Sequence, residues 1–222
     1  MSDKPIKIFV KGVRRVGNNF LMALLRRNLK RVKVIGSTHQ LPKWEDPKRF
    51  IDSEDKAEKY VVGIIKNPYS WFLSIDRWAK SSWGTDWQSA NWRNNWKMYK
   101  ELYEEFNDFY NKLWTFSENY SNYGEYYKGC LLIRYEELLA HTEENIKEMS
   151  NTFNVNTKVE KIIIPDVVPQ STKFTKHRRQ FYLSKGTFGL SKKLIDKINQ
   201  CVDWDLMSNY GYEICKGESN GK

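Results

Sequence analysis

One strand–loop–helix unit near the start of the chain constrains the fold more than any other feature. An apolar run at residues 6–10 is followed by the glycine-containing stretch GVRRVGNN, residues 12–19, and then by a helical pattern of apolar residues. Such a unit directs several backbone N–H groups and the positive end of the helix dipole toward one point. It therefore predicts an anion-binding loop. The alternative is an ordinary turn between a strand and a helix, because glycine spacings of this kind also arise by chance.

The loop lacks the two residues that define a triphosphate-binding P-loop. In G-x-x-x-x-G-K-[ST], the lysine reaches the terminal phosphates and the hydroxyl holds Mg²⁺. Here Asn18 and Asn19 follow the second glycine, and an amide is a poor substitute for either group. Arg15, two residues before that glycine, still supplies a fixed positive charge. We expect the loop to hold a phosphate-like group without a metal.

Further apolar runs alternate with helical patterns along the chain. The runs at residues 32–36, 60–66 and 130–135 predict strands, and Pro68 opens a helix directly after the second of them. Strands that alternate with helices favour an α/β fold. We expect three layers, with a central, mostly parallel sheet flanked by helices, as in P-loop nucleotide kinases.

The longest helical patterns come after the third expected strand, at 60–66. Aromatic and apolar residues repeat at three- and four-residue steps over 92–113 and again over 139–153, where acidic residues favour the helix start. Ser191 is the expected N-cap of a last helix. Residues 165–187 carry prolines and many polar residues, which favours an irregular segment.

Composition narrows the classes of protein and partner. The formal net charge of +10 attracts anions, either nucleic acid or a highly charged nucleotide. The three cysteines form neither a disulfide framework nor a zinc pattern, and no run approaches the roughly 20 apolar residues of a membrane span. We expect a soluble, cytoplasmic protein with a single domain at residues 1–215 and a disordered tail at 216–222. Its oligomeric state is not predicted.

Two segments resemble the cofactor motifs of sulfotransferases that use 3′-phosphoadenosine-5′-phosphosulfate (PAPS). Residues 15–20, RVGNNF, resemble the family's Lys/Arg-x-Gly-Thr-Thr-Trp/Phe loop, with asparagine at both threonine positions. Lys66-Asn67-Pro68 with Ser74 is similar to Arg-(Asn/Asp)-Pro with a serine eight residues after the arginine. The resemblance implies that the loop holds the 5′-phosphosulfate and that Lys66 and Ser74 bind the 3′-phosphate. The loop residues implied as cofactor contacts are Arg14, Arg15, Val16, Gly17, Asn18, Asn19 and Phe20.

Two later segments agree with other motifs of the same family. Residues 134–138, RYEEL, are similar to Arg-Tyr-Glu-Asp-Leu at a strand end, which implies that Tyr135 lines the adenine site. Residues 184–189, SKGTFG, resemble the Arg-Lys-Gly-x-x-Gly segment that closes over the 3′-phosphate. That resemblance implies Ser184, Lys185 and Gly186 as further cofactor contacts.

Residues 37–42, STHQLP, look like the Lys-Thr-His-Leu-Pro stretch of cytosolic sulfotransferases, in which the histidine is the general base. The resemblance implies this role for His39, although a serine replaces the lysine and one extra residue precedes Leu-Pro. A carboxylate can also act as a base, so Glu45 and Asp46 are alternatives to His39.

The motifs together predict sulfuryl transfer from PAPS to a hydroxyl or amine by in-line displacement, without a metal. His39 would deprotonate the acceptor, Arg15 would stabilise the developing charge, and 3′,5′-adenosine bisphosphate (PAP) would be the product. The acceptor stays open between a carbohydrate, a peptide tyrosine, a lipid and a small phenol. The alternatives are a P-loop-like kinase of nucleotides or small molecules, and a non-catalytic, basic nucleic-acid-binding protein. We expect no nucleic acid as a partner, because no nucleic-acid-binding motif is present.

Overall fold

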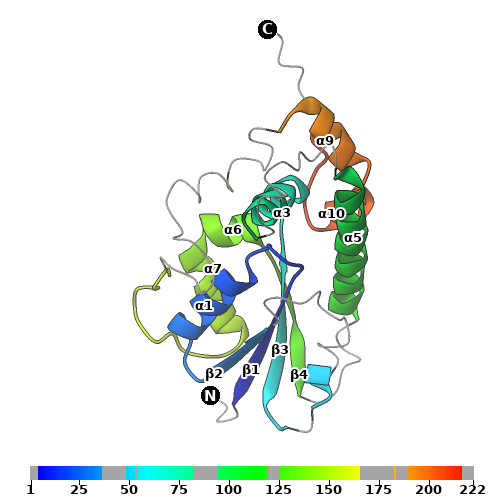
Figure 1. The fold of residues 1–222 in the computed structure, drawn as a ribbon. Coiled ribbons are helices and arrows are strands. Elements are labelled where there is room, and N and C mark those ends of the chain that lie inside the picture. The colour runs from blue at the N-terminus through cyan, green and yellow to red at the C-terminus, as the bar shows by residue number, and fades with distance from the viewer. Residues whose placement is uncertain are drawn as a thin grey trace.

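A four-stranded parallel sheet forms the centre of the protein (Figure 1). The structure, a computed structural model, describes residues 5–36, 49–53, 55–82, 95–119, 126–165, 183 and 190–216, with backbone alone at 79–82. The strand order is β2-β1-β3-β4, and all three neighbouring pairs are parallel. The predicted α/β class with a parallel sheet is confirmed. The strands are β1 (Ile6–Lys11), β2 (Val32–Gly36), β3 (Glu58–Ile65) and β4 (Tyr127–Arg134).

Helices cover both faces of the sheet, as expected for three layers. Figure 1 shows α1, α6 and α7 on one side of the sheet and α5 and α10 on the other. The helices are α1 (Asn18–Asn28), α3 (Pro68–Ser82), α5 (Trp96–Glu118), α6 (Tyr135–Ala140), α7 (Thr142–Thr152), α9 (Lys192–Asn199) and α10 (Trp204–Asn209).

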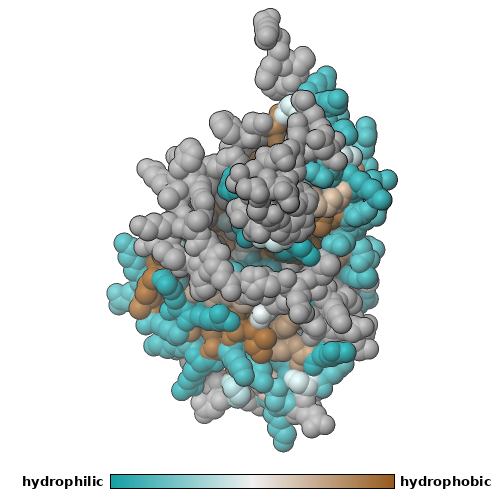
Figure 2. All heavy atoms as spheres, in the orientation of Figure 1, coloured by the Kyte–Doolittle hydropathy of each residue, from teal (hydrophilic) through white to brown (hydrophobic). Residues whose placement is uncertain are grey.

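The central strand β1 is buried on both faces. Ile8 and Val10 belong to the larger apolar cluster, together with Leu21 of α1, whereas Phe9 belongs to a smaller cluster with Phe116 of α5. Successive side chains of a strand point to opposite faces, so a strand covered on both sides needs an unbroken apolar run. In β1 the run Ile8, Phe9 and Val10 meets that need, and a lysine stands on either side of this run. On the face drawn in Figure 2, hydrophilic side chains cover most of the described surface.

Two helix predictions are corrected by the structure. The helix expected over residues 139–153 is divided at His141, whose φ of −124° and ψ of 49° are not helical. The acidic residues expected near its start, Glu143 and Glu144, lie in the first turn of α7. The Ser191 side chain caps α9 as predicted, but α9 is not the last helix, because Asp203 caps α10 after it. The stripe expected from residue 92 forms α5 from Trp96 onward, and residues 92–94 lie outside the described part.

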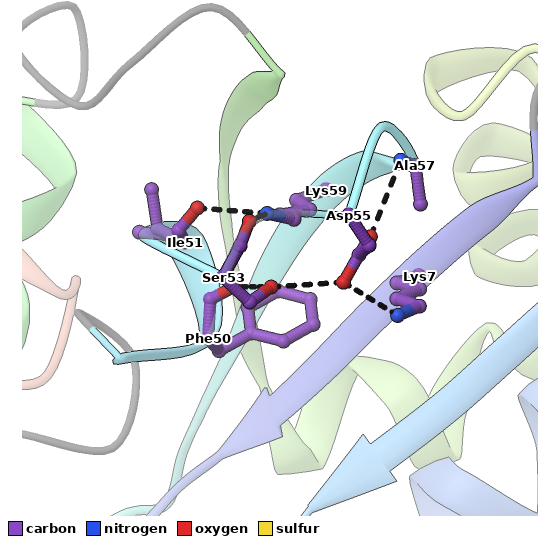
Figure 3. A network of polar contacts seen from close by, with 7 residues as sticks. All are labelled: Lys7, Phe50, Ile51, Ser53, Asp55, Ala57 and Lys59. Atoms are coloured by element: carbon purple, nitrogen blue, oxygen red, sulfur yellow. Dashed lines mark hydrogen bonds and ion pairs between the residues drawn. The ribbon is translucent and has the colours of Figure 1, made fainter.

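A polar network ties the chain that precedes β3 to the amino edge of the sheet (Figure 3). Lys7 Nζ donates to Asp55 Oδ2 at 2.7 Å, and Ser53 Oγ donates to the same oxygen at 2.9 Å. The buried ammonium of Lys59 donates to the carbonyls of Ile51 and Ser53, at 2.8 and 2.5 Å. The hydrogen bond from Lys7 is the main cause that lowers the pKa of Asp55 to about 2. These charged groups are therefore paired with one another at the amino edge of the sheet. The candidate site lies at the opposite, carboxyl edge.

The segment expected to be irregular, 165–187, and the tail expected at 216–222 lie almost wholly outside the described residues. Within the described part, no helix is both long enough and apolar enough to cross a bilayer.

Candidate functional site

The loop between β1 and α1 requires glycine at both of its glycine positions. A Cβ on Gly12 would lie 2.6 Å from Asn18 Oδ1 and 2.7 Å from Ile64 Cγ2. Gly17 has φ 107°, and a Cβ there would lie 2.4 Å from Cε2 of Tyr135. Asn18 Nδ2 donates to the Gly12 carbonyl at 2.9 Å and so closes the loop upon itself. Both positions are glycine because neighbouring side chains lie too close for a Cβ. The glycine spacing seen in the sequence therefore has a physical cause.

The start of α1 is electrostatically suited to an anion. Gly17 occupies the N-cap position, no side chain caps the helix, and its first turn contains no acidic residue. The positive end of the helix dipole is therefore not neutralised by a carboxylate of that turn. Arg15 lies exposed in the same loop with φ 67°, a left-handed conformation that is rare for a residue with a side chain. The local geometry suits a phosphate-like group, and the binding of such a group stays a prediction.

Lys66 and Ser74, which the sequence placed in one signature, meet at the carboxyl edge of the sheet. Lys66 follows the last residue of β3, and Ser74 lies two turns into α3. Lys66 Nζ donates to Ser74 Oγ at 2.7 Å, and the two residues are only 1% and 3% exposed. Ser74 Oγ donates in turn to the Ser70 carbonyl at 3.1 Å. A buried cation beside a hydroxyl at this edge is the arrangement expected of an anion site in an open α/β sheet.

The same ammonium connects this pair to the loop and to Tyr135. Lys66 Nζ lies 3.4 Å from the Arg15 carbonyl and 4.7 Å from the centroid of the Tyr135 ring. Tyr135 opens α6 directly after β4, is 5% exposed and packs against Gly17. Four predicted site residues from four different segments therefore converge at one place: Arg15, Lys66, Ser74 and Tyr135.

Helix α3 also anchors the first half of the loop. The indole Nε1 of Trp71 donates to the Arg14 carbonyl at 2.9 Å, and Trp71 is 2% exposed. The guanidinium of Arg14, predicted as a cofactor contact, lies over Trp78 with Cζ 5.8 Å from the ring centroid. The loop is thus held between α3, which carries Ser74, and α1, which begins directly after the loop.

Glu136, which the sequence did not single out, joins three segments beneath the site. Its Oε1 accepts hydrogen bonds from the Asn67 backbone N–H at 3.2 Å and from Ser70 Oγ at 2.9 Å. Its Oε2 accepts from the Tyr212 hydroxyl at 2.7 Å. Burial, followed by the charge of Glu136, raises the pKa of Tyr212 well above its ordinary value, so this hydroxyl stays a donor. The sequence signal that could have identified Glu136 was its place in the RYEEL motif, directly after Tyr135.

The C-terminal part of the chain braces the same helix starts. The backbone N–H of Cys215 donates to the Tyr69 hydroxyl at 2.8 Å, and that hydroxyl donates to Asn199 Oδ1. Arg134 Nη1 donates to the Gly211 carbonyl at 2.9 Å. The first turn of α3 is therefore fixed from the side of the C-terminus as well as by Glu136.

Several predicted site residues lie outside the described part of the chain. They are His39, its alternatives Glu45 and Asp46, and the segment with Ser184, Lys185 and Gly186. The general base and the closing segment stay predictions. Among the residues that are described, no three or more His, Cys, Asp or Glu side chains gather into a possible metal site.

Comparison with solved structures finds sulfotransferases with this architecture. One is mouse sulfotransferase SULT7A1 complexed with PAP, with a TM-score of 0.55 and 11% identity, covering 94% of this chain and 89% of that chain. Another is the sulfotransferase domain from the curacin biosynthetic pathway, with a TM-score of 0.54 and 13% identity, covering 96% of this chain and 100% of that chain. No family model and no curated protein matches the sequence. The chain has a sulfotransferase fold at very low sequence identity.

Proposed function

We propose that this protein is a sulfotransferase that transfers a sulfuryl group from PAPS to a hydroxyl or amine of an acceptor. The observation that carries the proposal is the buried contact between Lys66 Nζ and Ser74 Oγ, next to the loop that opens α1. Two anion-binding elements at one edge suit a nucleotide with phosphate groups at both its 3′ and 5′ positions. The fold shared with a sulfotransferase complexed with PAP supports the same donor.

In this proposal each element has one task toward PAPS. The loop N–H groups and the dipole of α1 receive the 5′-phosphosulfate, and Arg15 adds a fixed charge there. Lys66 and Ser74 receive the 3′-phosphate through charge-assisted and neutral hydrogen bonds. Tyr135, already packed against the loop and Lys66, borders the adenine. Ser184, Lys185 and Gly186 are proposed to close over the 3′-phosphate.

The transfer itself is an in-line displacement at sulfur. His39, or a nearby carboxylate, takes the proton of the acceptor hydroxyl. The acceptor oxygen forms a bond to sulfur while the bond from sulfur to the bridging phosphate oxygen breaks, and PAP leaves with that electron pair. Arg15 and the loop N–H groups stabilise the charge that builds on the sulfuryl and bridging oxygens. Positioning and charge stabilisation supply the rate, in analogy to phosphoryl transfer.

The kinase alternative is less well supported by the loop. Asn18 stands where a P-loop has the lysine, and its side-chain N–H₂ donates to the Gly12 carbonyl within the loop. It is therefore engaged in holding the loop rather than extended toward a terminal phosphate.

The free thiols of Cys130, Cys201 and Cys215 fit a reducing, cytoplasmic setting, which we propose for this enzyme.

A transfer assay with two labelled donors tests the proposal. The purified chain is incubated with ³⁵S-labelled PAPS, without metal, and with carbohydrate, phenol and tyrosyl-peptide acceptors. A parallel set uses γ-³²P-labelled ATP with Mg²⁺. Label in an acceptor from PAPS alone is expected. Transfer from ATP and not from PAPS would replace the proposal with the kinase alternative.

A further inference from the structure

The guanidinium of Arg14 contacts an aromatic ring but has no polar partner among the described residues. Its contact is the ring of Trp78, at 5.8 Å from Cζ to the centroid, and the side chain is half-buried. No hydrogen bond or ion pair of this guanidinium is found in the described part of the chain. Five N–H donors are therefore held on an aromatic platform next to the proposed donor site.

The carbonyl and the guanidinium of Arg14 contact different turns of α3. The Arg14 carbonyl is fixed by Trp71, whereas its guanidinium lies on Trp78, seven residues further along α3. At a rise of 1.5 Å per residue, these two rings are about 10 Å apart along the helix axis. Trp78 is also one turn beyond Ser74, which belongs to the proposed 3′-phosphate site. The guanidinium of Arg14 thus contacts α3 one turn beyond the residue that is proposed to bind the 3′-phosphate.

We propose that Arg14, stacked on Trp78, recognises an anionic group on the acceptor, so that the enzyme prefers acceptors that carry a carboxylate or a sulfate ester. This inference rests on the proposed sulfotransferase function. The 5′ and 3′ anions of PAPS already have matching elements in the loop, Arg15, Lys66 and Ser74, which leaves Arg14 for a further anion. Arg14 therefore acts as a specificity-determining residue rather than as part of the transfer centre.

The chemistry of a stacked guanidinium favours a planar or oxygen-rich anion. Its fork of N–H groups can donate two parallel hydrogen bonds to a carboxylate or to two oxygens of a sulfate. Contact with the Trp78 face removes rotational freedom in advance, so less is lost when an anion binds. A lysine at position 14 would keep the charge and lose both the fork and most of the stacking.

Titration of the PAP-saturated protein with matched probes tests the inference. The first set is 4-hydroxyphenylacetate against 4-methylphenol. The second set is methyl glucuronoside and methyl glucoside 6-sulfate against methyl glucoside, which separates carboxylate from sulfate recognition. In at least one set, the wild type is expected to bind an anionic probe about tenfold or more tightly than its neutral partner. This preference should fall to about twofold or less in Arg14→Ala, with Arg14→Lys between them.

Arg27→Ala is the matched control, because Arg27 is an exposed arginine in the last turn of α1 and its loss changes the net charge equally. It should keep the wild-type preference. The inference is overturned by three results: no anion preference in any probe set, a preference that Arg14→Ala leaves intact, or one that Arg27→Ala removes equally. Absence of PAP binding by the wild type, measured first, overturns the proposed function and this inference with it. Binding of PAP without an anion preference overturns the inference alone.

Discussion

The ammonium nitrogen of Lys66 lies 2.7 Å from the hydroxyl oxygen of Ser74, and both residues are buried at the carboxyl edge of the sheet. A buried cation is costly unless its N–H groups find acceptors. Ser74 supplies one acceptor and the Arg15 carbonyl supplies another, at the longer distance of 3.4 Å. This relationship unites the strand end, helix α3 and the loop, and it forms the centre of the proposed donor site.

Removal of the Ser74 hydroxyl is expected to weaken PAP binding without unfolding the protein. Ser74→Ala deletes one hydrogen-bonding group from the site while Lys66 stays in place. The loss of one hydrogen bond to a charged group, about 1.5 kcal/mol, corresponds to roughly a tenfold weaker affinity. Isothermal titration with PAP measures it. Ser150→Ala, which removes a buried hydroxyl bonded to the Val155 carbonyl far from the site, should keep wild-type affinity. Equal affinities for wild type and Ser74→Ala would exclude this hydroxyl from the site.

A methyl group at Gly17 is expected to destabilise the fold through contact with Tyr135. Gly17→Ala places a Cβ 2.4 Å from the Tyr135 ring at a residue with φ 107°, and the combined strain and clash should cost about 2–4 kcal/mol in the free energy of unfolding. Gly129→Ala is the control, because Gly129 also has a positive φ of 147° but nothing within 4 Å of a Cβ. Urea unfolding of both variants separates clash from backbone strain. Equal losses for the two would mean that Tyr135 does not restrict position 17.

Loss of the Glu136 carboxylate should impair recognition of the 3′-phosphate in particular. Glu136→Ala leaves the Asn67 N–H without its Glu136 acceptor, at the turn that carries Lys66. The Ser70 hydroxyl loses the Glu136 carboxylate and keeps only the Asn67 carbonyl, at 3.1 Å. Affinity for PAP should fall several-fold more than affinity for 5′-AMP, which has no 3′-phosphate. Glu136→Gln, which keeps an acceptor oxygen, should restore most of the difference.

Glu137→Ala is the matched control for Glu136→Ala, because it removes the neighbouring carboxylate, which pairs with Arg134 instead. Glu136 acts through the turn and is therefore a positioning residue. Equal losses of PAP and 5′-AMP affinity in Glu136→Ala would mean that the carboxylate supports the fold without positioning the 3′-phosphate site.

The acid limb of the stability profile should depend on Asp55. Its pKa is lowered to about 2, chiefly by the hydrogen bond from Lys7, from an ordinary value of 3.8. A carboxyl with a depressed pKa in the folded state stabilises the protein above the unfolded pKa, and this stabilisation is lost as the pH falls from about 4 to about 2. Thermal unfolding midpoints across this range should fall less steeply in Asp55→Asn than in the wild type. Parallel profiles would show that the Lys7–Asp55 pair contributes nothing to the free energy of unfolding.

Local apolar patterns in the sequence predicted the strands, whereas the resemblance to a sulfotransferase signature placed Lys66 and Ser74 in one site. The two side chains can meet because only Lys66 and Asn67 separate the end of β3 from the start of α3. The end of β3 at Ile65 rather than Lys66 also makes sense, since the lysine turns into the site. The order β2-β1-β3-β4 was not predicted, because strand pairing depends on contacts far apart in the sequence.

The features that the sequence did not predict depend on long-range contacts or on small local departures from periodicity. Glu136 accepts a hydrogen bond from Tyr212, which lies 76 positions further along the chain, and no local sequence pattern predicts such a partner. Arg14 was predicted as a cofactor contact from its place in the loop alone, and only the packing of α3 reveals Trp78 beneath its guanidinium. The break at His141 interrupts an apolar stripe that continues on both sides. Periodicity alone therefore predicted one helix over 139–153, where the structure has the end of α6 and then α7.

The most direct test of the proposed donor site compares PAP with 5′-AMP in the wild type and in Lys66→Met. The two ligands share the adenosine and the 5′-phosphate and differ only in the 3′-phosphate that Lys66 and Ser74 are proposed to hold. The wild type is expected to bind PAP at least about tenfold more tightly than 5′-AMP, and Lys66→Met should remove this preference while it stays folded. Equal binding of the two ligands by the wild type, or an undiminished preference in Lys66→Met, would contradict the proposed role of this pair.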